Sequence, residues 1–397
     1  MPPNPDCTAA SNSSPSCAQI ILPDISKYTR QYFDLRCNPF YQLGEAASEA
    51  WFDSYGLGYT GILSGTQLDK FFGYRFCLLA SLCFPDADLD HLRAAMDYFI
   101  WVFTFDDMAD LGELNIEEWQ RAVDTTMDIL HNPDRVQPKL KIAATLQSIF
   151  QRMRQNGNST AIRHFVEATE SYTRAITQDM ADHYAGHVQT FEEFRKYRRD
   201  TSGVKVTLAM LEYAHGINLP DEVMHDAIIS ELSLAGNEIL TWANDIYSFP
   251  VSILWFNCNH GLLRIRLSNP CLDPQKEYAQ GQTHNLVFVI MWHNQLGLQD
   301  ALNRAGELIE QRVQDYLVAK AQVPSFGPRL DHEVSRYIQG IEYCVQACID
   351  WSFMNTRYFG ANAAKVKEDR VVELDPQMKF GGMARVNHEM IKTATIG

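Results

Sequence analysis

The sequence predicts an all-α protein, and three observations carry that prediction. Apolar residues recur at the three- and four-residue spacing of a buried helix face through most of the chain, whereas the alternating pattern of strands is scarce. Proline signals separate the helices at residues 84–86, 132–134 and 219–221. The chain has 397 residues, of which 46% are hydrophobic, so it can bury a large core. With no internal repeat, we expect a single helical domain over residues 20–360.

The two ends of the chain differ from this helical region. Residues 1–19 begin with a stretch rich in Pro, Ser and Asn and lack the basic segment and apolar run of a secretory signal, so we expect a disordered leader. Residues 361–397 are polar and charged and are expected to form a loose C-terminal tail. No run of about eighteen apolar residues could span a membrane. These features predict a cytoplasmic protein without a membrane span.

The number and spacing of the cysteines also favour a cytoplasmic protein. There are nine, an odd number, and none shows the CxxC spacing of a zinc site, so we expect reduced thiols. Cys344 and Cys348 share a helix face, but two thiols do not complete a zinc site. Both are therefore predicted to be buried core residues.

The charge balance restricts the possible ligands. A formal net charge of −15 leaves no basic surface for nucleic acid, which is excluded as a partner. An acidic chain that binds an anion needs local positive charge, and metal ions held by carboxylates would supply it.

An aspartate-rich sequence ends the helix that starts after residues 85–88. The apolar stripe of this helix includes Phe99 and Phe103, and Asp106 and Asp110 continue on the same face. Such an acidic sequence is often a solvated helix end, but here the carboxylates would point inward, where unpaired charge is costly. Inward carboxylates need cations, and Mg²⁺ prefers hard oxygen ligands. The pattern predicts that Asp106 and Asp110 bind Mg²⁺.

A second polar pair lies in an apolar helix near the middle of the chain. Gly236, Leu240, Asn244 and Ser248 share one face, which places an amide and a hydroxyl one turn apart. Alone, this pair would be interpreted as a capped helix end. Together with the aspartate-rich helix, Asn244 and Ser248 become candidate metal ligands.

Two basic motifs could bind an anion. Arg199 is followed by Ser202 and Gly203; the planar guanidinium binds phosphate oxygens in pairs, and glycine permits close approach. Arg357 and Tyr358 add a cation and a phenol hydroxyl. Taken singly, these would be interpreted as surface arginines and an ordinary helix end.

The four motifs in this order resemble the fungal branch of the class I terpene synthases, and sesquiterpene cyclases in particular, over residues 20–360. The resemblance implies a class I terpenoid synthase-like helical bundle around a central active-site cavity. It implies three Mg²⁺ ions between the two metal-binding helices and a prenyl diphosphate substrate, with farnesyl diphosphate favoured. The protein would be a monomer or a homodimer.

The resemblance also assigns roles to the basic motifs. Arg199 stands at the position of the pyrophosphate-sensing arginine, with Ser202 and Gly203 at the linker and effector positions. Arg357 and Tyr358 stand at the terminal Arg-Tyr pair. Arg199, Arg357 and Tyr358 would be the catalytic residues, and all five would bind the substrate.

The second metal motif departs from the family pattern, Asn-Asp-x-x-Ser-x-x-x-Glu. Ser252 stands where the glutamate belongs, and Pro250 would cost about 3 kcal/mol in a helix interior. If residues 250–274 are skipped, Glu277 takes the position of the third ligand. We hypothesise that these 25 residues are an insertion, such as a translated intron or a splice variant. A real insertion must loop out for Glu277 to rejoin the helix; otherwise activity would be weak or absent.

Aromatic residues near the motifs could line a dry cavity for the carbocation. The candidates, each able to offer about 0.5 to 2 kcal/mol of cation–π stabilisation, are Phe76, Trp101, Phe103, Phe105 and Trp351.

Two other functions remain open at this point. A chain-elongating prenyl diphosphate synthase shares the helical fold, but its second aspartate-rich motif is replaced here by Asn244 and its neighbours. A catalytically impaired protein that only binds diphosphates is the other alternative, because the second metal motif is interrupted.

Overall fold

The computed structural model describes residues 18–57, 71–110, 116–183, 189–259 and 285–374, with the backbone alone for residues 18, 106–110, 116, 179–183 and 250–259. This part of the chain is α-helical apart from a short 3-10 helix, η1, and two strands, which confirms the predicted all-α class. The elements are β1 (Ala18–Ile21), α1 (Ile25–Thr29), α2 (Tyr41–Ser54), α4 (Phe76–Cys83), α5 (Leu89–Asp110), α6 (Ile116–His131), α7 (Lys141–Asn156), α8 (Ser159–His183), α9 (Phe191–Thr201), α10 (Val204–Ala214), α11 (Asp221–Met224), α12 (Ala227–Asn259), α14 (Leu286–Asn294), α15 (Leu298–Lys320), α16 (Pro328–Trp351), η1 (Gly360–Asn362), α17 (Ala363–Asp369) and β2 (Val371–Leu374).

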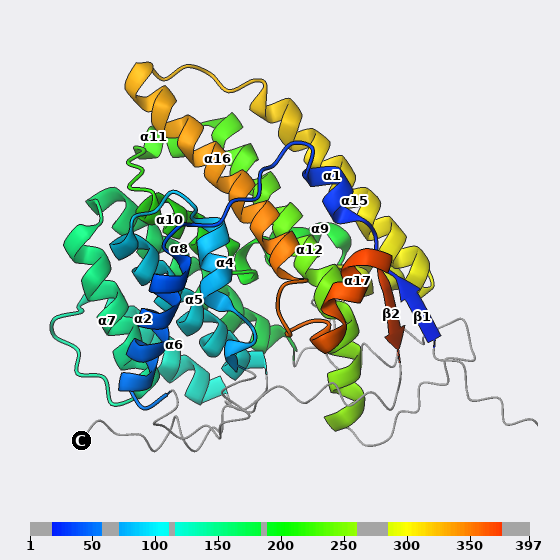
Figure 1. Ribbon diagram of the computed structural model, residues 1–397, viewed down its shortest axis with the longest axis horizontal. Helices are drawn as coiled ribbons and strands as arrows, with labels where there is room; N and C mark the ends of the chain where they lie inside the picture. The colour runs from blue at the N-terminus through cyan, green and yellow to red at the C-terminus, as the bar shows by residue number, and fades with distance from the viewer. Residues whose placement is uncertain (1–17, 58–70, 111–115, 184–188, 260–284, 375–397) are drawn as a thin grey trace, which may run out of the picture.

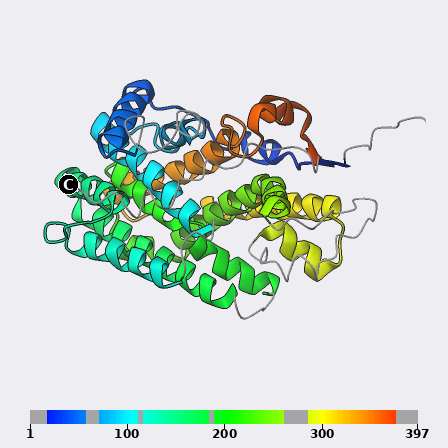
Figure 2. The same cartoon turned by 90° about the horizontal axis from the view of Figure 1, so that it is seen from below.

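The long helices α12, α15 and α16 form one part of the bundle. Helix α12 packs against both α15 and α16 (Figure 1), and Figure 2 shows α12 and α15 running side by side. Helix α5 packs against α2, α4, α7 and α10 in the other part. One continuous cluster of buried apolar side chains joins the two parts, so α5 and α12 belong to the same core.

Helix boundaries follow the signals in the sequence. The Asp88 carboxylate accepts a hydrogen bond from the His91 backbone N–H, at 3.0 Å, and so caps the start of α5. Helix α6 ends immediately before residues 132–134, and α11 begins directly after Pro220. All three breaks predicted from proline are thereby confirmed.

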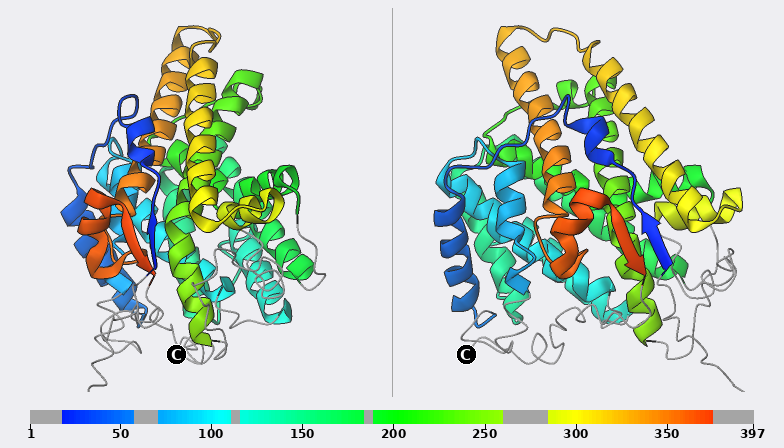
Figure 3. Two further views of the ribbon diagram at one scale, coloured as in Figure 1. Left: turned by 90° about the vertical axis from the view of Figure 1, so that its right-hand side faces the viewer. Right: turned by 45° about the vertical axis from the view of Figure 1, so that its right-hand side comes forward.

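Residues 18–21 and 361–374 are more ordered than the composition suggests. Strand β1 pairs antiparallel with β2, next to α1 and α17 (Figure 3). The prediction of a loose tail is therefore wrong for residues 361–374, and the predicted leader is too long because β1 starts at Ala18. The reason is that Val366, Val372 and Leu374 bury their side chains within this otherwise polar sequence.

The cysteines and the helix lengths of the described residues agree with the sequence analysis. Cys344 and Cys348 are buried free thiols, as predicted, and the other described cysteines are also free. Among the helices of the described ranges, none combines the length and apolar character needed to cross a bilayer.

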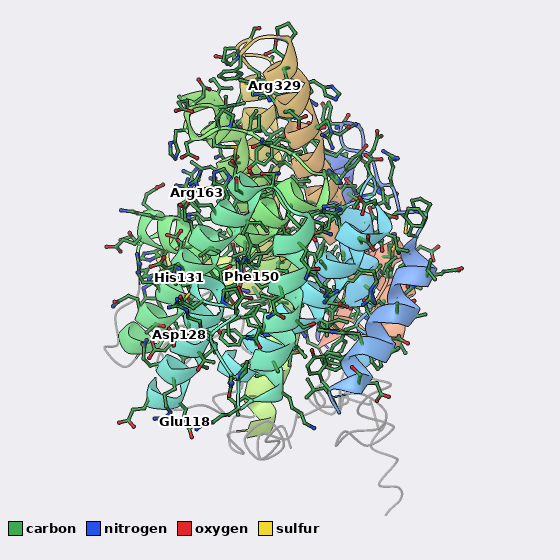
Figure 4. The ribbon with its side chains drawn as sticks, turned by 90° about the vertical axis from the view of Figure 1, so that its left-hand side faces the viewer. Glu118, Asp128, His131, Phe150, Arg163 and Arg329 are labelled. Carbon is green, nitrogen blue, oxygen red and sulfur yellow. The ribbon has the colours of Figure 1, made fainter. Side chains whose placement is uncertain are left out.

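His164 links three helices. Its Nδ1 lies 2.7 Å from an Oε2 of Glu212 on α10, and its Nε2 lies 3.0 Å from Oδ1 of Asp221 on α11. The neighbouring Arg163, labelled in Figure 4, also pairs with Asp221. The hydrogen bond to Glu212 raises the pKa of His164 above its ordinary value of 6.5, against the opposing effect of burial. His164 therefore favours the charged form in the folded state.

Replacing His164 by glutamine should destabilise the protein most at acidic pH. Because the pKa of His164 is higher in the folded state, its contribution is fully present below 6.5 and is lost as the pH rises through the folded-state pKa. Urea unfolding of wild type and His164→Gln at about pH 5.5 and about pH 8.5 measures the difference. His332→Gln, on the exposed face of α16, is the control. A difference between wild type and variant that grows toward pH 8.5 would contradict this assignment.

Candidate active site

Helix α12 is buried on nearly all sides, with one open face. Between Ala235 and Phe249 every residue is buried except Leu240, Asn244 and Ser248, which follow one another at four-residue steps. This spacing places the three side chains in a row along the helix. The predicted helical phase of Asn244 and Ser248 is confirmed.

Asn244 meets the Arg-Tyr motif directly. Its Nδ2 donates a hydrogen bond to the Tyr358 hydroxyl oxygen at 2.8 Å. Within the described residues, the Oδ1 of Asn244 has no hydrogen-bond partner, so this oxygen is available to a ligand. Two motifs more than a hundred residues apart in the sequence are therefore in contact, and their common role in a site stays a prediction.

Arg357 extends the site toward α5. Its guanidinium carbon lies 5.4 Å from the ring centroid of Tyr74, 5.9 Å from that of Phe76 and 5.3 Å from that of Phe103. Phe103 stands on α5 three residues before Asp106. The adjacent residues Arg357 and Tyr358 thus connect the aspartate-rich helix with α12.

The carboxylates expected to bind metal lie at the limits of what the structure describes. The backbone at Asp106 and Asp110 is helical, at the end of α5. Their side chains, and the whole of Glu277, lie outside the described residues. Their roles as ligands stay predictions.

The expected break at Pro250 does not occur. Helix α12 continues through Pro250 to Asn259, so the prediction that the inserted segment interrupts the helix at Pro250 is wrong. Proline removes one backbone donor, but its fixed φ is helical, and residues 251–256 contain no glycine or second proline. Ser252 consequently stands on the same helix as Asn244 and one turn after Ser248, in the literal third position of the motif.

Three of the five predicted cavity aromatics lie together beside the Arg-Tyr pair. The ring centroids of Phe76 and Phe103 are 4.3 Å apart, and Trp351 lies 6.1 Å from the first and 5.9 Å from the second. Trp351 also meets Tyr358 edge-on at 5.8 Å. These rings form an aromatic surface next to the polar face of α12.

The other two aromatics face elsewhere. Trp101 and Phe105 stack at 4.9 Å, Phe105 contacts Trp119 on α6, and Trp101 Nε1 donates to the backbone carbonyl of Ile142 on α7. Both stand two residues from Phe103, so the helix turns them to the other side of α5. This packing gives no support to their assignment to the cavity wall, which stays a prediction.

Arg199 is held against α12 by a residue that the sequence did not single out. Its Nε donates to Oε1 of Glu238 at 2.7 Å, and Glu238 also pairs with Arg195 and Arg312. Burial tends to raise the pKa of Glu238, but Arg195, Arg312 and Arg199 lower it below its ordinary value. Glu238 therefore stays ionised and connects α9, α12 and α15.

Asp245 is a second residue that sequence reasoning missed. Its Oδ1 accepts from Arg198 at 2.8 Å, its Oδ2 accepts from the Leu286 N–H at 3.1 Å, and its carbonyl accepts from Asn285 at 2.8 Å. Burial raises its pKa, and Arg198 opposes that shift. Asp245 follows Asn244 by about 100° around the helix, so it points away from the open face. It holds α9 and α14 against α12.

Ser202 and Gly203 form the junction between α9 and α10. Gly203 has φ 72° and ψ −4°, the left-handed region that glycine adopts without strain. The Ser202 hydroxyl accepts from the Val204 N–H at 3.3 Å, and the Gly203 carbonyl accepts from the Thr207 N–H at 3.1 Å. This backbone geometry explains the glycine, whereas contact of either residue with substrate stays a prediction.

The donor set on α12 fits a hard metal ion. Among the side chains that the structure describes, no three or more His, Cys, Asp or Glu residues are arranged to hold a metal. The unclaimed amide oxygen of Asn244 and the Ser248 hydroxyl are, however, the neutral oxygen ligands that Mg²⁺ accepts beside carboxylates. The aspartates at the end of α5 would complete such a site.

The all-α bundle has the helical fold of the class I terpenoid synthases, as the solved structures that it resembles show. The structure resembles an SVS_A2 protein from ancestral sequence reconstruction, with a TM-score of 0.65, 20% identity, and coverage of 81% of this chain and 87% of that one. It also resembles hedycaryol synthase in complex with nerolidol, with a TM-score of 0.62, 19% identity, and coverage of 80% and 96%. At these identities the likeness concerns the fold alone.

Sequence comparison identifies the family. The family model "Terpene synthase family 2, C-terminal metal binding" matches residues 97–253 and 259–315, together more than half of the chain. Sesquiterpene synthase 3 of Postia placenta is 32% identical over 88% of this chain and 87% of its own length. Sesquiterpene synthase Agr1 of Cyclocybe aegerita is 29% identical over 94% and 99%. The chain belongs to the terpene synthase family, and the gap in the match falls inside the segment 250–274.

Proposed function

We propose that this protein is a Mg²⁺-dependent sesquiterpene synthase that ionises farnesyl diphosphate, cyclises the carbocation and releases diphosphate. The observation that carries the proposal is the contact between Asn244 and Tyr358, which joins the expected metal helix to the Arg-Tyr pair. The family membership and the names of the relatives, which are 27% to 32% identical, support the same reaction class.

Oxygen ligands from α5 and α12 would hold the metal ions. When bound, the ions supply positive charge that neutralises the diphosphate as its bond to the allylic carbon breaks. The residues that would hold them are Asp106, Asp110, Asn244, Ser248 and a third ligand on the second motif, which is Glu277 if the segment 250–274 is absent and Ser252 if it is present.

Three side chains would bind the diphosphate directly. In this proposal the Tyr358 hydroxyl accepts from Asn244 and donates its own proton toward a diphosphate oxygen. Arg357 donates from its guanidinium, and Arg199 exchanges its contact with Glu238 for the diphosphate. Glu238 would keep its ion pairs with Arg195 and Arg312, so its buried charge stays compensated when Arg199 turns to the diphosphate.

The aromatic surface would stabilise the carbocation. Arg357 lies over the faces of Phe76 and Phe103 without substrate. When Arg357 turns to the diphosphate, these ring faces and Trp351 become available to the cation. Each ring can contribute about 0.5 to 2 kcal/mol in the absence of water.

Incubation of the purified full-length protein with farnesyl diphosphate and Mg²⁺, followed by gas chromatography, tests the function. We expect a cyclic hydrocarbon or alcohol that disappears when the metal is chelated. A longer prenyl diphosphate would instead identify a chain-elongating synthase. Diphosphate binding without any product would identify a catalytically impaired protein.

Removal of residues 250–274 should raise turnover. The deletion joins Phe249 to Gln275 and places Glu277 four residues after Ser248, one turn along α12. A carboxylate then replaces the weaker hydroxyl of Ser252 as third ligand. Rates of product formation for the full and the shortened chain measure the effect.

Two further variants serve as controls for that comparison. Glu277→Gln in the shortened chain should cancel the gain, whereas the same change in the full chain should have little effect. An unchanged or lower rate after deletion would count against the insertion. A transcript that encodes residues 250–274 in every copy would refute an intron as its origin.

A further inference from the structure

A cavity of about 490 Å³ is lined by residues of α1, α12 and α17 and by Phe353. It forms where α1 and α17, from the two ends of the chain, pack near each other (Figure 1). Tyr247 of α12 and Phe353 form part of its wall. Asn244 and Ser248 are not among the residues that line it.

Positive charge predominates around this cavity. Asp24 lines it and pairs with Arg370 at 3.4 Å, and the fully buried Asp350 pairs with Lys367 at 3.0 Å and with Arg30. The lining includes four cationic side chains, namely Lys27, Arg30, Lys367 and Arg370. Four positive charges therefore face two negative ones, an excess of two in a chain whose net charge is −15.

Lys27 carries the clearest part of this excess. Its ammonium group has no ion-pair or hydrogen-bond partner within the described residues. The other three cations have carboxylate partners that bind the chain ends to each other and to α16. Lys27, which is exposed, leaves its positive charge uncompensated at the cavity wall.

Tyr247 adds a hydroxyl group that has no hydrogen-bond partner among the described residues. The residue is 2% exposed and lines the cavity. Its ring packs against Phe353 and Phe359, at centroid distances of 5.0 and 6.2 Å, but among the described residues its hydroxyl makes no hydrogen bond. Because Tyr247 lines the cavity, this hydroxyl is free to donate a hydrogen bond to a ligand there.

We propose that this cavity binds a phosphate-type anion with at least two negative charges. The Tyr247 hydroxyl donates to an anion oxygen, and Lys27 and Arg370 supply the cationic contacts. Arg30 and Lys367, which share Asp350, add to the attractive field. This second anion site goes beyond the proposed function and does not depend on it, because no metal ion and no reacting substrate are involved.

The position of the anion site would couple anion binding to the candidate active site through helix α12. Tyr247 stands between Asn244 and Ser248 in sequence, so an anion that orders Tyr247 also restrains the helix that bears both. The two chain ends would be restrained with it, through α1 and α17.

Calorimetric titration of the full-length, metal-free protein with inorganic diphosphate tests the proposal. Chelation of metal leaves the candidate active site without the ions that it needs for diphosphate. We expect one binding event per chain. Tyr247→Phe, Lys27→Gln and Arg370→Gln should each weaken it about tenfold, since each removes a charged or charge-assisted hydrogen bond. Lys365→Gln is the matched control, because Lys365 lies on α17 but pairs with Glu373 and does not line the cavity.

Further titrations identify the anion and the site at which it binds. Comparing the affinity for isopentenyl diphosphate with that for inorganic diphosphate distinguishes an organic diphosphate ligand from an inorganic one. Only isopentenyl diphosphate has an apolar group that can contact the apolar wall of the cavity. Absence of binding to the metal-free protein would overturn the proposal, as would equal binding by Tyr247→Phe and Lys27→Gln in folded protein checked by circular dichroism. Sulfate of the same ionic strength that competes as well as diphosphate would show mere charge screening. Loss of binding in Arg357→Gln would assign the anion to the candidate active site instead.

Discussion

Asn244→Ala should reduce product formation by more than about a hundredfold, because changes that merely disturb metal ligands already cost 10- to 100-fold. The substitution removes both the unclaimed amide oxygen and the hydrogen bond to Tyr358. Turnover of farnesyl diphosphate at increasing Mg²⁺ concentration measures the loss. Asn303→Ala, at an exposed position of α15, is the matched control and should behave like wild type.

The same experiment tests whether α5 and α12 share one metal site. Asp106→Ala should cost a comparable factor, and the double variant should cost little more than either single change, as groups that act as a unit do. Losses that multiply would show that Asp106 and Asn244 act independently. A fully active Asn244→Ala protein would refute the assigned role of α12.

Asp245→Ala should give the largest loss of stability, about 3 to 5 kcal/mol in the free energy of unfolding. The substitution removes the carboxylate that lies 2.8 Å from the Arg198 guanidinium, whose side chain is 18% exposed. It also removes the acceptor of the Leu286 N–H at the start of α14. Urea unfolding measures the change, with Asp128→Ala on α6 as the control, since Asp128 is exposed (Figure 4).

A double variant distinguishes this pairing from a general effect of losing Asp245. If Arg198→Gln restores part of the stability lost in Asp245→Ala, the loss of the ion pair between Asp245 and Arg198 is the cause. An Asp245→Ala protein as stable as Asp128→Ala would contradict the account. Asn244→Ala, one residue away but on the open face, should lose far less stability.

The all-α fold and the helix face that carries Asn244 and Ser248 could be predicted from local sequence patterns. Proline signals fixed three helix boundaries, and the four-residue spacing of Leu240, Asn244 and Ser248 predicted the open face of α12. Both depend on neighbours within a few turns of the same helix. Helical periodicity conveys that information directly.

The features that were missed depend on distant partners. Glu238 and Asp245 appear as ordinary acidic residues in an apolar helix until α9 brings Arg199 and Arg198 against them. The residues near Glu238 and Asp245 in the sequence do not indicate which distant side chains will pair with them. Pro250 was misjudged for a related reason, because propensity weighs one residue and not the helix that contains it.

The pairing of β1 with β2 has a consequence for how the protein is made. Ile21 pairs with Val371, which follows 350 residues later in the chain. During synthesis the first strand leaves the ribosome long before its partner exists, so the helices between them must collapse while that edge is still open. Closure of the strand pair would then be among the last steps of folding and would depend on completion of the polypeptide.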